Sequence, residues 1–300
     1  MPAPAEDGWG PTKHVNLRKA TSTGARIWQN YLMPSRLDEL ADWFRLALDH
    51  GYKFCSVAEY WRLTDAGRLK PPVKTIVLRH DIDVDLAAAH AMFSLEKMLL
   101  INSSYYFRLN TIDLPLMHAI AGSGGEASYH YEELATEAKA HRLRSPEQVR
   151  ARMPIIRQQF GENLQRLRAT TGLPITTVAS HGDWVNRSLR LANTVVLECP
   201  DLRKNCGVQV EAYDYELLKF FTVRYADAIC PKWWSGKRVT QAGPGRLEFL
   251  DDCPKTPAAG VREGLPFIYV LLHPEQWRRG PRWHFNADMK RIWEAIAYRS

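Results

Sequence analysis

The sequence predicts a parallel α/β fold. Short apolar runs alternate with segments of helical periodicity along most of the chain, which is typical of strands joined by crossover helices. The run at residues 76–78 is apolar without alternation, and such runs indicate strands buried on both faces. Several runs end directly in histidine or carboxylate residues, as expected where parallel strands present functional groups at their carboxyl ends.

The first half of the chain carries clear boundary signals. Residues 35–50 read as an amphipathic helix, with Ser35 as N-cap and Gly51 as the C-terminal stop. The strand around residues 76–78 leads into a helix at about 86–99. Next we expect, in order, a strand at 104–109, a short helix at 114–120, a glycine-rich turn at 122–125, a strand at 126–130 and a helix at 132–141.

The second half continues the alternation. Ser145 and Pro146 mark a helix start, with serine as cap and proline in the first turn. Pro154 should kink this helix or divide it in two, because proline removes a helical hydrogen bond. Further strands are expected at 175–179, near 208–211, at 220–225 and at 267–272. An amphipathic helix at 286–298 closes the chain, and its apolar residues are expected to face inward: Met289, Ile292, Trp293 and Ile296, with Phe285 just before it.

Composition and length are those of an ordinary folded, soluble protein. Of the 300 residues, 45% are hydrophobic and 24% charged. The five cysteines are scattered and form no Cys-x-x-Cys pair, which argues against a disulfide framework or a zinc ribbon. No apolar run suits a membrane helix and the start lacks a secretory signal, so we expect a cytoplasmic protein. The expected organisation is a loose segment at 1–24 and a single domain at 25–300.

The net charge of +7 suits an anionic partner. The densest basic stretch, residues 277–284, mixes arginines with aromatic residues, so a nucleic-acid or anionic-lipid binder is one hypothesis. The chain shows no recognition-helix, zinc-finger or RNA-binding signature, and a solvated loop before the last helix explains the stretch. We therefore expect no nucleic-acid partner.

Ionisable residues recur where the predicted strands end. Two carboxylates and a histidine within four residues, as at 80–83, can supply a metal ligand and a general base, although a turn that caps the next helix is the structural alternative. The residues at these strand ends are Arg79, His80, Asp81 and Asp83, then His130 and Glu132, then His181 and Asp183, then Asp227, and finally His273. Each one alone can be a packed or turn residue, but the repeated pattern predicts a single functional site.

These motifs, in this order, resemble those of the polysaccharide deacetylase family, the NodB-type hydrolases of carbohydrate esterase family 4. Leu-Arg-His-Asp-Ile-Asp at 78–83 resembles a divergent form of the first motif, and Glu-Ala-Ser-Tyr-His-Tyr-Glu at 126–132 resembles the second. Ser-His-Gly at 180–182 takes the place of the third, and Leu-His-Pro at 272–274 resembles the last. The resemblance covers roughly residues 73–277 and implies a distorted, incomplete (β/α) barrel.

The resemblance also implies roles for individual residues. Asp81 would be the general base and His273 the general acid, while Asp83 and His130 would bind a metal ion. The family's adjacent aspartate pair is Asp81-Ile82-Asp83 here, Leu134 occupies the position of a second histidine, and the family's arginine near the third motif is absent. His181 is therefore expected as the third ligand. Additional candidates for ligation or outer-shell support are His80, Glu132, Asp183 and Asp227, and candidates for substrate binding are Arg79, Trp184 and Trp234.

The implied activity is metal-dependent removal of an acetyl or formyl group from the nitrogen of a carbohydrate. Zinc is the expected metal, with cobalt, nickel and manganese as alternatives. The implied substrate is a carbohydrate or a nucleotide- or lipid-linked sugar precursor of a surface glycan. The alternative is a catalytically inactive carbohydrate-binding relative, which Leu134 favours because leucine cannot bind metal.

Overall fold

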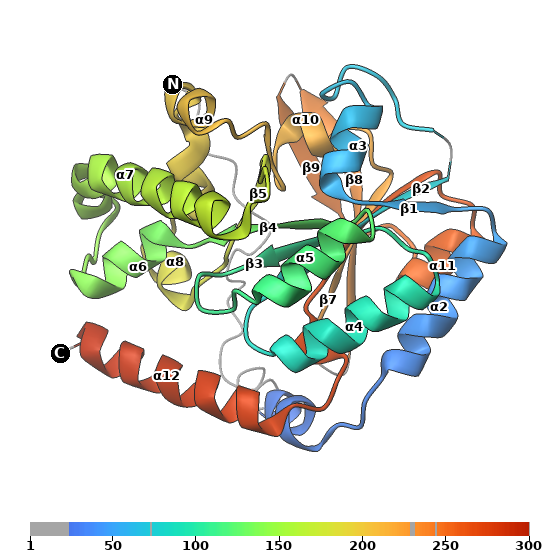
Figure 1. Ribbon diagram of the computed structural model, residues 1–300, viewed down its shortest axis with the longest axis horizontal. Coiled ribbons are helices and arrows are strands. Elements are labelled where there is room, and N and C mark those ends of the chain that lie inside the picture. Colours follow the sequence, from blue (N-terminus) through green and yellow to red (C-terminus); the bar gives the residue numbers. More distant parts are fainter. Residues whose placement is uncertain (1–23, 73, 229–231, 244, 300) are drawn as a thin grey trace.

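The computed structural model describes residues 24–72, 74–228, 232–243 and 245–299. Residues 1–23 of the segment expected to be loose lie outside this described part. A ten-stranded, mostly parallel sheet forms the centre, in the order β6-β5-β4-β3-β2-β10-β7-β8-β9, and β1 pairs with β2 (Figure 1). The predicted parallel α/β fold is confirmed.

The elements are bounded as follows. The strands are β1 (Lys53–Cys55), β2 (Thr75–Ile82), β3 (Ser104–Phe107), β4 (Glu126–Tyr131), β5 (Thr177–Ser180), β6 (Val210–Glu211), β7 (Val223–Asp227), β8 (Trp234–Gly243), β9 (Arg246–Leu250) and β10 (Phe267–Leu272). The α-helices are α2 (Leu37–Asp49), α3 (Val57–Leu63), α4 (Leu86–Met98), α5 (Leu114–Gly122), α6 (Glu133–Ala140), α7 (Pro146–Thr171), α8 (Trp184–Leu189), α9 (Pro200–Cys206), α10 (Tyr215–Leu218), α11 (Pro257–Arg262) and α12 (Pro281–Arg299). A π-helix, η1 (Trp28–Leu32), and two 3-10 helices, η2 (Asn193–Glu198) and η3 (Pro274–Gln276), complete the described chain.

Strand β2 lies between neighbours along its whole length. It pairs with β10 on one side, and on the other side with β1 along its first half and with β3 along its second half. Every residue of β2 is buried. A strand enclosed in this way needs apolar residues on both faces, which explains the unbroken apolar run in the sequence.

The two faces of β2 have different neighbours. Ile76 and Leu78 pack with α2 and α4 on the outer face of the sheet. Val77 packs on the inner face in a cluster that also contains residues of β3, β6 and β10. The hydroxyl of Tyr269, on β10, donates to the carbonyl oxygen of Ala212 just after β6, at 3.2 Å, although four strands separate β10 from β6 in the sheet. The sheet therefore curves strongly around its inner face.

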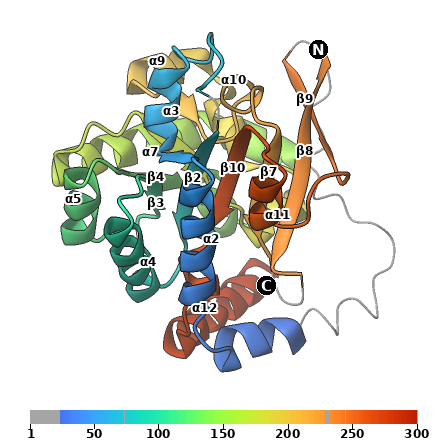
Figure 2. The same ribbon diagram turned by 90° about the vertical axis from the view of Figure 1, so that its right-hand side faces the viewer.

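Helices cover the outer face, and a hairpin extends the sheet. α5 and α7 pack against β3 and β4 through a second apolar cluster. β8 and β9 form an antiparallel hairpin beyond β7, at the edge of the molecule in Figure 2. No helix in the described part of the chain is both long and apolar enough to cross a membrane.

Two sequence predictions about helices are wrong, and one of the two alternatives for a third is excluded. α2 begins at Leu37 with Arg36 as its N-cap, so Ser35 does not cap it. α7 runs uninterrupted through Pro154 and is not divided there, because the packing of its apolar residues on the sheet outweighs one lost hydrogen bond. The apolar residues of α12 do not face inward; Ile292, for example, is 52% exposed.

Candidate metal centre

The carboxyl ends of five parallel strands bring the predicted site residues together. Strands β2, β4, β5, β7 and β10 run parallel to one another within the sheet, so their carboxyl ends lie along the same edge. The residues at this edge are Asp81 and Asp83 of β2 and its following turn, His130 of β4, His181 after β5, Asp227 of β7 and His273 after β10. The site residues therefore lie together because these strands run in the same direction.

Asp83, His130 and His181 form a compact triangle of donor atoms. Asp83 Oδ1 lies 3.3 Å from His130 Nε2 and 3.1 Å from His181 Nδ1, and the two ring nitrogens are 3.2 Å apart. Ligand atoms about 2.1 Å from a tetrahedral metal ion are separated by about 3.4 Å. The triangle therefore has the dimensions of one face of a tetrahedral metal site.

The environment of Asp83 and His130 favours ligation over simple pairing. Asp83 Oδ1 is buried and has no well-formed hydrogen bond among the described residues. Burial alone would raise the pKa of Asp83, but His181 and His130 hold it well below its usual range. Nδ1 of His130 lies 3.0 Å from the carbonyl oxygen of Ala179, so Nδ1 carries the proton and Nε2 presents its lone pair to the triangle.

Asp81 points toward the same triangle but is held by Arg79. The guanidinium group donates to both carboxylate oxygens, at 2.8 and 2.6 Å, and Asp81 Oδ2 lies 3.5 Å from His130 Nε2. Burial alone would raise the pKa of Asp81, but Arg79 and His130 lower it. Asp81 is therefore ionised at neutral pH, beside the donor triangle and not within it.

The position of Arg79 does not fit its predicted role in substrate binding. Its side chain is fully buried, and it also donates to the hydroxyls of Tyr269, at 3.2 Å, and Tyr213, at 3.0 Å. A side chain enclosed in this way orients Asp81 and cannot contact a substrate in this conformation.

His273 and Asp227 form a second ionisable pair at the strand ends. His273 Nδ1 lies 2.7 Å from Asp227 Oδ1, and the backbone N–H of His273 donates to Asp227 Oδ2 at 2.7 Å. The indole N–H of Trp277 donates to the same Oδ2 at 3.0 Å. Burial alone would lower the pKa of His273, but the Asp227 carboxylate raises it well above its usual value. Asp227 therefore orients His273 and keeps it protonated at neutral pH.

His80, a candidate ligand, does not join the site. It follows Arg79 by one residue and so projects to the outer face of β2. Its Nε2 lies 2.5 Å from Glu96 Oε1 on α4, and Glu96 also accepts from Ser103 and Tyr105. His80 belongs to a buried network between sheet and helix.

Glu132 and Asp183 lie close to His181, but each carboxylate is paired with a cation. Arg108 donates to both oxygens of Glu132, at 2.6 and 2.8 Å, and also to the backbone carbonyl of Asp83. Asp183 caps α8 and accepts from Lys139 Nζ at 2.9 Å. With these partners, the two carboxylates shape the loops around the triangle. Their oxygens lie close enough to His181 to form an alternative ligand group, yet the paired cations oppose this.

The two candidate substrate tryptophans pack against other aromatic residues. Trp184 makes an edge contact with Tyr298 of α12, at a centroid distance of 5.2 Å. Trp234 packs between Trp43, at 6.0 Å, and Trp277, at 5.3 Å. Both rings remain partly exposed. Their described contacts are those of packing residues and do not include the donor triangle.

Glu275 lies just after the end of β10, and the sequence pattern gave it no role in the site. It follows His273 by two residues, and its buried Oε2 has no hydrogen-bond partner among the described residues. Burial, then the charge of Asp83, raises the pKa of Glu275 to about 8. Its sequence signal is a second ionisable residue directly after the Leu-His-Pro motif.

Comparison with models of known protein families gave no match for the chain, and comparison with curated proteins gave no similar sequence.

Proposed function

We propose that the protein is a metal-dependent hydrolase that removes an N-acyl group, acetyl or formyl, from a carbohydrate. The observation that carries this proposal is the triangle of Asp83, His130 and His181, at the spacing of metal ligands, with an ionised Asp81 and a protonated His273 at the same edge of the sheet. A ligand set, a base and an acid are the parts that metal-assisted amide hydrolysis requires. The proposed substrate is a sugar or a nucleotide- or lipid-linked sugar precursor.

The proposed fold is an incomplete (β/α) barrel. Its support is the curvature of the sheet, which brings Val77, Tyr106, Val210 and Tyr269 into one inner cluster. In such a barrel the inner residues of each strand fill the interior below the site. β6 and β7 are the two ends of the parallel series. They are not paired with each other in the described sheet, which leaves the proposed barrel open between them.

Two histidines and one carboxylate suit a divalent ion such as zinc, with cobalt, nickel and manganese as alternatives. A bound divalent metal would lower the pKa of a coordinated water and polarise the acyl carbonyl. Asp81, ionised and oriented by Arg79, accepts the proton of the attacking water. His273, protonated and oriented by Asp227, donates a proton to the leaving amine. The products are a free amine and a short carboxylic acid.

Metal content tests the proposal directly. We expect near-stoichiometric zinc or a related metal in the purified wild type, measured by elemental mass spectrometry, and little in Asp83→Ala, His130→Ala or His181→Ala. Loss of an outer-shell partner alone weakens metal binding about 10–100-fold, and loss of a direct ligand weakens it further.

His90→Ala is the matched control, because this histidine is half exposed and pairs with Asp113 away from the triangle. Its metal content should equal that of wild type. Wild type without metal, even after incubation with zinc, cobalt, nickel or manganese, would refute the hydrolase and leave the carbohydrate-binding alternative. With metal present, amine release from N-acetylated and N-formylated sugars identifies the substrate class.

The Asp227–His273 pair predicts a pH effect. Replacing Asp227 with asparagine should lower the pKa of His273, because the carboxylate is what raises it. A general acid acts only while protonated, so the alkaline limb of the kcat profile should move to lower pH. Above the lowered pKa, kcat should fall about tenfold per pH unit.

Trp277→Phe is the control for this experiment, since it removes a hydrogen bond to Asp227 without removing the charge. Its alkaline limb should stay close to that of wild type. An unchanged limb in Asp227→Asn would mean that His273 is not the acid whose ionisation controls the rate.

A further inference from the structure

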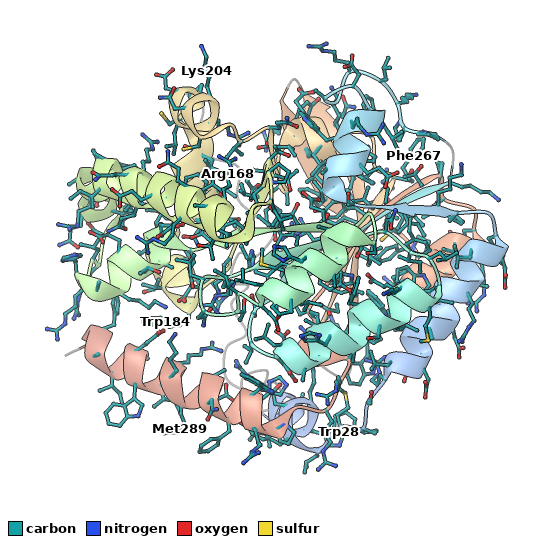
Figure 3. The ribbon with its side chains drawn as sticks, viewed as in Figure 1. Trp28, Arg168, Trp184, Lys204, Phe267 and Met289 are labelled. Carbon is teal, nitrogen blue, oxygen red and sulfur yellow. The ribbon has the colours of Figure 1, made fainter. Side chains whose placement is uncertain are left out.

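Helix α12 presents its polar side to the protein and its apolar side to solvent. On the inward side His284 and Tyr298 are buried, Asp288 pairs with Arg26 at 2.8 Å, and Glu294 accepts from Lys139 at 2.9 Å. The helix runs along one edge of the molecule, and Met289 points away from the rest of the protein (Figure 3). A helix on the surface of a monomer has the reverse arrangement.

The outward apolar residues extend into a larger surface. Tyr31 of η1 donates to Asp288 of α12 at 2.9 Å, which fixes η1 beside the start of the helix. The exposed apolar residues of η1 and its start and of the outward side of α12 are here called the α12 face: Ile27, Trp28, Leu32, Phe285, Met289, Ile292, Trp293 and Ile296.

The size of the α12 face fits a protein interface. These eight residues are 38% to 66% exposed. At about 200 Å² for each large apolar side chain, they expose on the order of 800 Å². The largest apolar patch on a typical monomer is about 300–600 Å², and a stable complex buries about 800 Å² on each partner.

The spacing of the stripe identifies the shape of the partner. Phe285, Met289, Ile292 and Ile296 follow one another at steps of four, three and four residues. This is the a/d repeat of a coiled-coil seam, which packs against another helix. The order of steps is the same when read backwards, so the stripe matches an antiparallel copy of itself.

We propose that the α12 face binds the α12 face of a second copy of this chain, with the two α12 helices antiparallel across a two-fold axis. Such an interface uses the same surface on both subunits. Phe285 then lies opposite the partner subunit's Ile296, and Met289 opposite the partner subunit's Ile292. This inference does not depend on the proposed enzymatic activity.

A hollow of about 600 Å³ lies beside the start of the stripe and is lined by Tyr31, Pro281, Arg282, Phe285 and Asn286. In the proposed arrangement it faces the C-terminal end of the second α12 helix, where the partner subunit's Ile296 lies opposite Phe285.

The first test is the mass of the full chain in solution, by light scattering and sedimentation over a range of concentrations. Wild type should have twice the 34.4 kDa mass of one chain. Ile292→Glu should weaken dimerisation at least about 100-fold, because a symmetric interface carries each substitution twice. Wild type that is monomeric at every concentration would overturn the proposal.

Two controls and a crosslinking experiment sharpen this test. Met98→Glu changes a residue that is 75% exposed on α4 and should leave the dimer intact, and thermal unfolding should show that both variants are folded. A mixture of Phe285→Cys and Ile296→Cys chains should form a mixed disulfide, whereas a parallel pair would link Phe285→Cys chains to each other. Monomeric wild type that sediments with anionic lipid vesicles, and Ile292→Glu that does not, would show that a membrane surface occupies the α12 face and would overturn the proposal of a second copy.

Discussion

Replacing Arg79 with methionine should lower the free energy of unfolding by about 3–5 kcal/mol. The substitution removes the guanidinium group that donates to both oxygens of Asp81 and leaves that carboxylate buried. An unpaired buried charge loses its hydration without compensation. Urea unfolding followed by circular dichroism measures the change.

The double replacement of Arg79 by methionine and Asp81 by leucine separates the loss of pairing from the loss of packing. Removing both charges should recover most of the stability, because apolar residues often replace a buried ion pair without loss. Arg238→Met is a matched control, since Arg238 also forms a paired ion contact, with Asp252, but on the surface. That variant should change stability little. Equal effects in Arg79→Met and Arg238→Met would contradict the assigned role of Arg79.

Asp81→Asn should lower kcat about 10²–10⁴-fold while the metal content stays at the wild-type level. The asparagine amide keeps the size of the side chain but cannot accept a proton from water. Asp81 lies outside the donor triangle, which Asp83 completes with two histidines. Amine release from the substrate and elemental analysis of the same sample measure the two quantities.

Comparison with Asp83→Asn distinguishes the roles of the two aspartates. It should lose metal and activity together, because Asp83 supplies the oxygen atom of the triangle. If Asp81→Asn also lost its metal, Asp81 would be a ligand and the proposed division of roles would be wrong. If it kept full activity, Asp81 would not be the base.

The elements predicted most accurately are those whose formation depends most on local sequence signals. The apolar runs of β2 and β10 and the capped helices α4 and α5 lie within a few residues of their predicted positions. The hairpin β8–β9 was not predicted, because its residues are mostly half exposed and no face of it shows a clean apolar repeat. β1 was also missed, since a strand of three residues carries too little pattern.

The donor triangle was predictable because each of its residues lies at or just after the carboxyl end of a strand, and parallel strands align their carboxyl ends. The two-residue period of β2 also indicates that Arg79 and Asp81 share a face that His80 does not. The tyrosines that enclose Arg79 were not predictable. Tyr213 and Tyr269 lie far from it in the sequence, and only the curvature of the sheet brings them to its side chain.

The amphipathic pattern of α12 predicted a helix with one apolar face but not the direction of that face. Periodicity reports that a stripe exists, and the assumption that it faces the core holds for a helix that completes its packing within one chain. In this protein the ion pairs of Asp288 and Glu294 hold the polar face of α12 against the protein, so its apolar face points to solvent. Arg26, just before η1, and Lys139 on α6 decide its orientation, and these contacts are long-range.

The alternation along β2 limits how this protein can change through evolution. Arg79 and Asp81 serve the site on one face, while His80 holds α4 on the opposite face through Glu96. Inserting or deleting one codon within β2 would exchange the two sets, burying the ionic pair against α4 and turning the histidine into the interior. We therefore expect β2 to tolerate substitutions but not a single-residue insertion or deletion, whereas the loops after the strands can lengthen and change the surroundings of the site.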